Sequence, residues 1–268
     1  MQPGTLLRAQ KSQAAHSYLF RPPAKNFPFR VEAPTLNAAL AAPLPTTVDL
    51  RQYCRPIWPD GQGTTPACTG FASAAFREVI HAVATGTVLN DYLSPMYIYA
   101  YSLLDQGQFG NTTAGSSIAE EFYVLTNHGD CPYTAYTKDD LTQGHAPTAA
   151  DDVSAYPFRL TGSGVVDYGT RDSVKQILAS RQPIAISFAV YLSFEQTGRN
   201  GIVPAVDTAN EPFMGAHAVL VVGYNDTPGY WIVRNSWGIT WGDAGYCYMP
   251  YGYEGSTWLE AWSAPPQP

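Results

Sequence analysis

The sequence predicts an α+β protein with two packed lobes, because helical periodicity dominates its first half and short strands its second. Helical patterns run from residue 68 to about residue 126, and β-branched and aromatic segments follow after residue 155. The chain has 268 residues, of which 45% are hydrophobic. That length is sufficient for one large domain or for two lobes with a sizeable core.

The first helix is predicted over residues 68–86, where apolar side chains recur every four positions. Gly86 stands at its end, where glycine commonly terminates a helix. Two further helices are predicted over residues 97–104 and 117–126, and His128-Gly129 follows the second as a stop signal. The breadth of the apolar pattern indicates that the first helix is mostly buried.

Three strands are predicted in the second half, over residues 184–190, 218–223 and 230–234. Each is short and rich in β-branched or aromatic side chains, as half-buried strands are. One helix, residues 172–179, is expected among the strands. The acidic pairs at 139–140 and 151–152 indicate either solvated loops or helix starts.

Residues 1–46 differ from the rest of the chain, because they hold seven prolines with aromatic residues between them. Proline at this density excludes a long helix and favours extended backbone. Five basic residues against one acidic give residues 1–43 a charge of +4, which leaves −11 for the remainder of a chain of net charge −7. The segment is therefore either a tail without fixed structure or a basic arm that docks on an acidic body. Its candidate anchors are Tyr18, Phe20, Phe27 and Phe29.

Composition excludes several classes of partner. A net charge of −7 argues against nucleic acid, which requires a basic surface. No apolar run reaches the ~20 residues of a membrane span, and no secretory leader is visible at the start. Localisation stays open, since a secreted or periplasmic site would require that a leader had been removed. We expect a monomer.

The four cysteines are Cys54, Cys68, Cys131 and Cys247, and they form no CxxC pair. The histidines likewise show no ligand spacing, so no metal and no cofactor are predicted. If Cys68 is a free reactive thiol, three cysteines remain and at most one internal bridge can form among them.

Cys68 is the candidate nucleophile, because it begins the predicted buried helix after a small-residue approach, Pro66-Ala67. Unpaired N–H groups at a helix start favour an anion and lower the pKa of a thiol. A catalytic cysteine also needs a base and donors for the developing oxyanion. His217, at the entry of an apolar strand, and Asn235, at the exit of the next, are candidates for the base and for its orienting partner.

Taken together, these segments resemble the papain family of cysteine peptidases, in its bacterial branch, from about Pro45 to Tyr253. His217 lies 149 residues after Cys68, and Asn235 lies 167 residues after it. The family spacing is ~130–150 residues, so Asn235 comes somewhat late, as a short insertion would produce. The resemblance implies a two-lobed papain-like fold, with a helical N-terminal lobe, an antiparallel β-barrel-like C-terminal lobe and the cleft between them.

The resemblance also implies a role for each matching residue. Gln62, six positions before Cys68, would complete the oxyanion hole with the Cys68 N–H. His217 would form an imidazolium–thiolate pair with Cys68, and Asn235 would fix the imidazole ring. Candidate substrate-binding residues are Gly115 and Ser116, which resemble the stretch that pairs with extended substrate, Trp237, which would shield the His–Asn bond, Trp241 on the leaving-group side, and Ala216.

The chain departs from the family pattern around the nucleophile. Thr65 replaces a cysteine, which implies the loss of one disulfide, and Thr69 replaces a tryptophan, which implies a different cleft wall. Ala216 stands where some members have an acidic neighbour of the histidine. None of these changes removes a predicted catalytic group.

We therefore expect a cysteine endopeptidase that acts on proteins or peptides. Residues 1–44 would form an inhibitory pro-segment-like arm, released by cleavage near Pro43–Thr46, and residues 45–268 the peptidase domain. The arm lacks the long helical pattern of typical papain pro-regions. A silent binding protein on the same scaffold, or an amidase or ligase with the same triad, are the alternatives, because a fold does not fix an activity.

Overall fold

The computed structural model describes residues 35–36, 43–111 and 113–268. The predicted arm therefore lies almost entirely outside the described residues. Only Thr35–Leu36 and residues 43–44 of it are described.

The helical lobe comes first in the chain, as the sequence predicts. Its described helices are α1 (Cys68–Thr85), α2 (Pro95–Asp105), α3 (Ile118–Asn127), α4 (Lys138–Thr142) and α5 (Ala149–Ala155). Gly86 ends α1 in the left-handed conformation, with φ of 73°, and its N–H donates to the Ala82 carbonyl. This confirms the predicted helix stop, since glycine adopts that backbone conformation without a Cβ penalty.

The second lobe is built on a sheet with the strand order β1-β3-β8-β4-β5-β6-β7, and β2 pairs with β5 beside this path. The strands are β1 (Thr35–Leu36), β2 (Thr47–Asp49), β3 (Gly164–Val166), β4 (Ile184–Tyr191), β5 (Phe213–Asn225), β6 (Tyr230–Arg234), β7 (Tyr246–Pro250) and β8 (Trp258–Ser263). All pairs are antiparallel except β1 with β3. Among the described strands β1 and β7 are the two ends of the order, so the sheet is open and does not close into a barrel.

Short helices complete both lobes. The helices α6 (Arg171–Ala179), α7 (Leu192–Glu195) and α8 (Tyr253–Ser256) accompany the sheet, and short 3₁₀ turns lie at Arg51–Tyr53 and Tyr156–Phe158. The acidic pairs prove to be helix starts, because α4 and α5 each begin with a capping box between a threonine and the aspartate three residues later.

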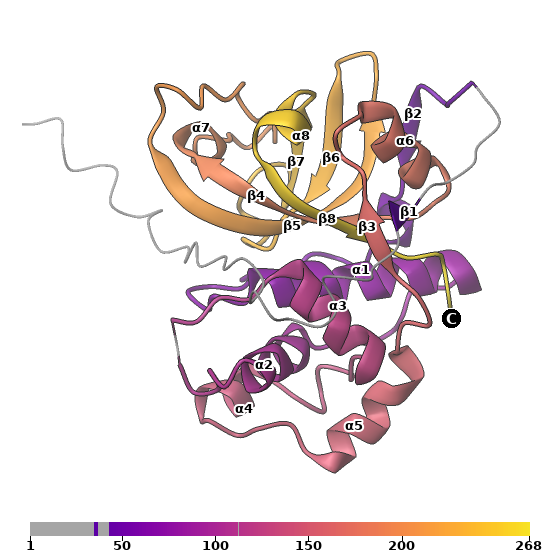
Figure 1. Cartoon of the computed structure of the whole chain (residues 1–268), viewed down its shortest axis with the longest axis vertical. Coiled ribbons are helices and arrows are strands. Elements are labelled where there is room, and N and C mark those ends of the chain that lie inside the picture. Colours follow the sequence, from indigo (N-terminus) through magenta and orange to yellow (C-terminus); the bar gives the residue numbers. More distant parts are fainter. Residues whose placement is uncertain (1–34, 37–42, 112) are drawn as a thin grey trace, which may run out of the picture.

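Helix α1 lies at the centre of the molecule, between the other helices of its lobe and the sheet (Figure 1). Phe76 and Ile80 of α1 are fully buried, and the ring centroid of Phe76 is 4.8 Å from that of Phe122 on α3. The same core includes Ala218 and Leu220 of β5. Burying a side chain such as Phe or Ile contributes about 1.5–3 kcal/mol, so α1 is anchored on both sides and its first residue is firmly placed.

The described chain shows two further features of the fold. All four cysteines are free thiols, so the bridge that the sequence allowed is not formed. No helix in the described residues combines the length and apolar character that crossing a membrane requires.

Candidate active site

Cys68 is the first residue of α1 and is only 1% exposed. Burial raises the pKa of its thiol to about 11, although the N–H groups of Ala218, Thr69 and Cys68 act in the opposite direction. The N–H groups at the helix start thus lower the pKa of the thiol, as expected, but desolvation of the anion outweighs them. A thiolate at this position needs a nearby cation.

His217 lies on β5 and is fully buried. The N–H of the following residue, Ala218, donates a hydrogen bond to the Cys68 thiol. Its Nε2 is 2.7 Å from Oδ1 of Asn235. The same Oδ1 accepts a hydrogen bond from the Ser236 N–H at 2.8 Å, so it is the carbonyl oxygen of the amide and Nε2 is the donor. This bond occupies Nε2, so a proton exchanged with the thiol would be carried by Nδ1.

Antiparallel pairing of β5 with β6 brings these two side chains together. Leu220 pairs with Arg234, so Asn235 leaves β6 beside the part of β5 that carries His217. The Asn235 N–H donates to the Gly245 carbonyl at 3.0 Å, which fixes the backbone at this exit. Asn235 is 3% exposed, and a hydrogen bond that is shielded from water in this way is electrostatically strong.

Aromatic rings cover the His–Asn pair. Trp237 stacks on His217, with ring centroids 4.7 Å apart and planes at 28°. Trp241 packs edge-on against Trp237 at 5.2 Å, and Phe194 contacts both tryptophans. Both indole rings are more than nine-tenths buried, so they form a hydrophobic cover that holds the imidazole plane.

Gln62 is held in the loop that leads to Cys68. Its Nε2 donates to the Thr65 carbonyl at 2.9 Å, and its Oε1 accepts from the Ser236 hydroxyl at 2.6 Å. Gly61 makes this docking possible, because it has φ of 58° and a Cβ there would collide with the Ser236 carbonyl oxygen. A primary amide has two N–H donors, so Thr65 uses one and an oxyanion would require the second.

The structure thus gathers Gln62, His217 and Asn235 around the turn that bears Cys68. Ser236 is the link that the sequence did not single out, since its N–H bonds Asn235 and its hydroxyl bonds Gln62. Its only signal in the sequence is its place next to Asn235.

The other predicted substrate-binding residues are also buried. Gly115 and Ser116 immediately precede α3 and are buried, and Ala216, paired with Ala189 of β4, is 7% exposed. Thr69, expected at a cleft wall, is fully buried. It donates a hydrogen bond to Glu121, a buried carboxyl group that the sequence analysis missed.

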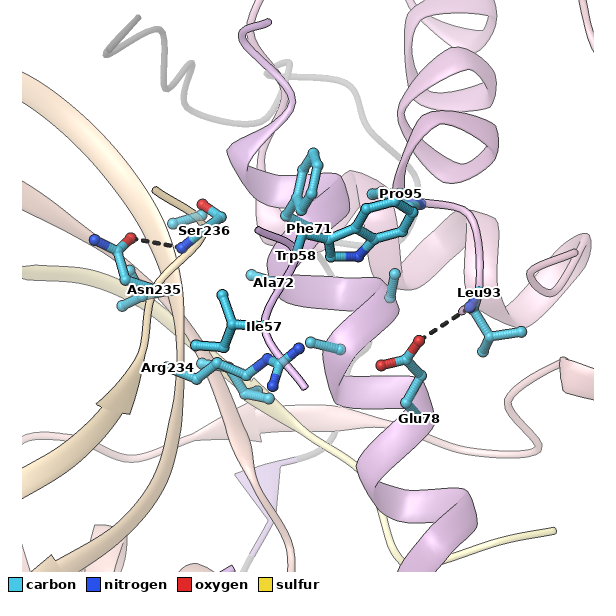
Figure 2. A pocket seen from close by; sticks show the side chains of 15 residues that line it. Ile57, Trp58, Phe71, Ala72, Glu78, Leu93, Pro95, Arg234, Asn235 and Ser236 are labelled. Carbon is cyan, nitrogen blue, oxygen red and sulfur yellow. Dashed lines mark hydrogen bonds between the residues drawn. The ribbon is translucent and has the colours of Figure 1, made fainter. Parts of the chain in front are cut away.

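Behind these residues lies a narrow cavity of about 20 Å³ between α1 and the strands β5 and β6 (Figure 2). It has room for a single water molecule. Asn235, Ser236 and the buried side chains of Glu78 and Arg234 are among the residues that line it. The cavity is too small for a peptide and serves as internal space between the lobes.

No group of three or more His, Cys, Asp or Glu side chains suited to a metal occurs in the described part of the chain.

Comparison with known proteins agrees with this geometry. In fold, the chain is similar to xylellain, a cysteine protease from Xylella fastidiosa, with a TM-score of 0.79 and 24% identity over 96% of this chain and 97% of xylellain. It is also similar to digestive procathepsin L 3 of Tenebrio molitor, with a TM-score of 0.65 and 21% identity over 87% of this chain and 75% of that one. The predicted papain-like fold and the likeness to a bacterial member are thereby confirmed.

In sequence, the chain is 27% identical to the oryzain gamma chain of Oryza sativa subsp. japonica over 224 residues. The match covers 79% of this chain and 57% of oryzain, so the chain spans little more than half the length of this plant relative. The profile described as papain family cysteine protease matches residues 44–262. The chain therefore belongs to the papain family of cysteine proteases, which are hydrolases.

Proposed function

We propose that this chain is a cysteine endopeptidase in which Cys68 is the nucleophile, His217 the acid and base, and Asn235 the residue that orients His217. The observation that carries this proposal is the 2.7 Å hydrogen bond between His217 and Asn235. The N–H of Ala218, the residue after His217, donates to the Cys68 thiol and so brings the thiol next to the imidazole. In this arrangement one imidazole nitrogen is fixed and the other serves the thiol.

Transfer of the Cys68 proton to Nδ1 of His217 supplies the cation that the buried thiolate needs. The thiolate attacks the peptide carbonyl carbon, and the negative charge that develops on oxygen is held by the Cys68 N–H and the Gln62 amide. His217 then returns its proton to the leaving amine, which leaves a thioester on Cys68. Water, deprotonated by His217, hydrolyses the thioester and regenerates the thiol.

We also propose that residues 1–44 act as an inhibitory arm on a peptidase domain of residues 45–268. The family match begins at residue 44, next to the predicted cleavage region. The predicted catalytic groups support a covered site, because Cys68, His217, Asn235 and Gln62 are each 3% exposed or less. In this proposal, release of the arm gives a peptide access to Cys68.

The backbone of the arm offers one further clue. Thr35–Leu36 pairs in parallel with Val165–Val166 of β3 and so extends the sheet. This part of the arm adds a strand to the peptidase domain, and release of the arm would have to break that pairing.

Hydrolysis of fluorogenic peptides by the full chain, by a chain that starts at residue 44, and by Cys68→Ala in both forms tests these proposals. We expect Cys68→Ala to abolish hydrolysis and the shorter chain to be the more active. Full hydrolysis by Cys68→Ala would exclude Cys68 as nucleophile, and equal rates with and without the arm would exclude inhibition.

The same substrates separate the alternatives. A peptide library run on the shorter chain would give a cleavage profile for an endopeptidase. Turnover confined to small non-peptide amides would indicate an amidase, and binding without turnover would indicate a silent scaffold.

A further inference from the structure

A buried carboxyl group outside the proposed mechanism contacts the residue that follows Cys68. Glu121 lies in the first turns of α3 and is fully buried. Its Oε1 accepts hydrogen bonds from the hydroxyls of Thr69, at 2.8 Å, and Ser116. Thr69 belongs to the first turn of α1, and Ser116 belongs to the stretch proposed to pair with substrate.

Thr69 and Ser116 also contact each other, with 2.6 Å between their hydroxyl oxygens. Three oxygens, Glu121 Oε1, Thr69 Oγ1 and Ser116 Oγ, thus form a closed triangle. Each side of such a triangle requires one proton, and the two hydroxyls supply only two. The third proton has to come from the carboxyl group: a protonated Oε1 donates to one hydroxyl, and that hydroxyl then donates to the other, so the triangle is complete only when Glu121 is protonated.

The surroundings of Glu121 favour the protonated form. Ser102 donates a further hydrogen bond to Oε1 at 3.3 Å, whereas the other oxygen, Oε2, is buried without a hydrogen-bond partner among the described residues. A buried carboxylate oxygen without a donor is costly, and a neutral carboxyl group avoids much of that cost.

We propose that Glu121, in its protonated form, is a positioning residue that ties the first turn of α1, which carries Cys68, to the substrate-pairing stretch at Ser116. This role rests on the proposed function, because that function assigns the nucleophile to one of the two segments that the triangle joins and substrate pairing to the other. It does not involve contact between Glu121 and substrate. The triangle fixes the distance between the turn that carries Cys68 and the stretch at Ser116 that would align the peptide.

Charge supports this role. Burial raises the pKa of Glu121 to about 7, while the hydrogen bonds from Ser116 and Thr69 lower it. The titratable groups that its charge affects are Cys68 on α1, Tyr99 on α2, Glu120 on α3 and Asp130 after α3. All four groups are acids that become negatively charged when they ionise. An ionised Glu121 is therefore repelled by their anions and disfavours the Cys68 thiolate.

Ionisation of Glu121 should therefore act on the site in two ways. It removes one proton from the triangle, so that one of the three contacts loses its hydrogen bond. It also places a negative charge near Cys68, which raises the pKa of that thiol further. Both effects oppose the increase of thiolate with pH, so the reactivity of Cys68 should rise less steeply above pH about 7 than below it.

Alkylation of Cys68 by iodoacetamide, followed by peptide mapping on the full chain between pH 5 and 9, tests the proposal without requiring peptide hydrolysis. In the wild-type protein we expect an inflection near pH 7 that Glu121→Gln abolishes, with alkylation at pH 8 faster in the variant by about twofold or more. Glu120→Gln is the matched control, because a glutamine at this position can still accept the capping hydrogen bond from the Ser117 N–H. The alkylation profile of this variant should retain the inflection near pH 7.

A second pair of variants covers the case in which Glu121→Gln does not fold. Thr69→Val removes one hydroxyl of the triangle at nearly constant shape and, because that hydroxyl lowers the pKa of Glu121, should move the inflection to higher pH, whereas Thr69→Ser should leave it in place. An infrared difference spectrum of wild type minus Thr69→Val, at pH 5.5, needs no access to the thiol. A shifted band of a protonated carboxyl group supports the triangle.

The outcomes are distinguishable from failure of the proposed function. Identical alkylation profiles in wild type, Glu121→Gln and Thr69→Val, or no difference in the carboxyl band, would overturn the positioning role. An inflection that follows Glu121, in a protein that hydrolyses no peptide, would support the positioning role and reject the peptidase.

Discussion

Replacement of Asn235 by alanine tests the geometry of the site most sharply, because it removes one oxygen with two short bonds. Oδ1 accepts from His217 Nε2 at 2.7 Å and from the Ser236 N–H at 2.8 Å. In the proposed mechanism the first bond orients the imidazole and stabilises the imidazolium. The second only secures the amide.

The size of the effect follows from the character of that bond. A hydrogen bond to a charged group contributes about 1.5–3 kcal/mol, and each 1.36 kcal/mol corresponds to about a tenfold change in rate. Loss of the bond should therefore lower kcat/KM by about 10- to 150-fold. Trp237 still stacks on the ring at 4.7 Å, so the imidazole keeps its plane and activity is not abolished.

The assay is kcat/KM on a fluorogenic peptide, measured on the chain that starts at residue 44 and corrected for the fraction of active sites. Asn225→Ala is the matched control, because Asn225 ends β5, the strand that carries His217, at the end away from His217, and its Oδ1 accepts from the Thr227 N–H. We expect the control to stay within about twofold of wild type. A folded Asn235→Ala protein with wild-type kcat/KM would refute the proposed orienting role.

Three further predictions concern other parts of the structure. Gln62→Ala should lower kcat by about 10²–10³-fold, as loss of an oxyanion donor does, and unchanged kcat would exclude Gln62 from that role. Glu78 is fully buried and its pKa is raised to about 7 from 4.5. The folded protein therefore binds more protons than the unfolded one between these values, and the free energy of unfolding should fall by on the order of 3 kcal/mol as the pH rises from about 4.5 to 7. Glu78→Gln should remove this contribution from the slope in urea titrations, while Glu121, whose pKa is also raised to about 7, keeps its own; an unchanged slope would exclude the contribution of Glu78. Phe76→Ala should lower the free energy of unfolding by about 3–5 kcal/mol, and a loss below about 1 kcal/mol would contradict its place in the core.

The strongly periodic elements were predictable from the sequence. The apolar repeat of α1 and its terminal Gly86 fixed the helix to within one residue, and β6 was predicted with the observed bounds. The strand at 218–223 is longer than predicted, because β5 begins at Phe213, which is 62% exposed and breaks the buried pattern.

Elements without a clear period were missed. The strands β7 and β8 occupy tyrosine-, proline- and tryptophan-containing segments, and their pairing with β6 and β4 defines them more than local propensity does. The helices α4 and α5 are short, and their capping boxes were noticed only as acidic pairs.

The site was predictable in part for a similar reason. Cys68, His217 and Asn235 are recognisable from type and spacing, but the tertiary contacts around them are not. A glutamate in a helix is ordinarily assigned to a solvated face, so nothing in the sequence indicated that Glu121 is buried against Thr69 and Ser116. The raised pKa of Cys68 was also hidden, because it depends on the complete burial of the thiol.

The most direct test of the central claim is to map the site of covalent labelling by an epoxysuccinyl inhibitor in the chain that starts at residue 44. Cys54, Cys131 and Cys247 are also free thiols and serve as internal controls. We predict one label per chain, on Cys68 alone, with peptide hydrolysis lost in proportion to labelling. Labelling of another cysteine, or full hydrolysis by a chain labelled at Cys68, would contradict the account.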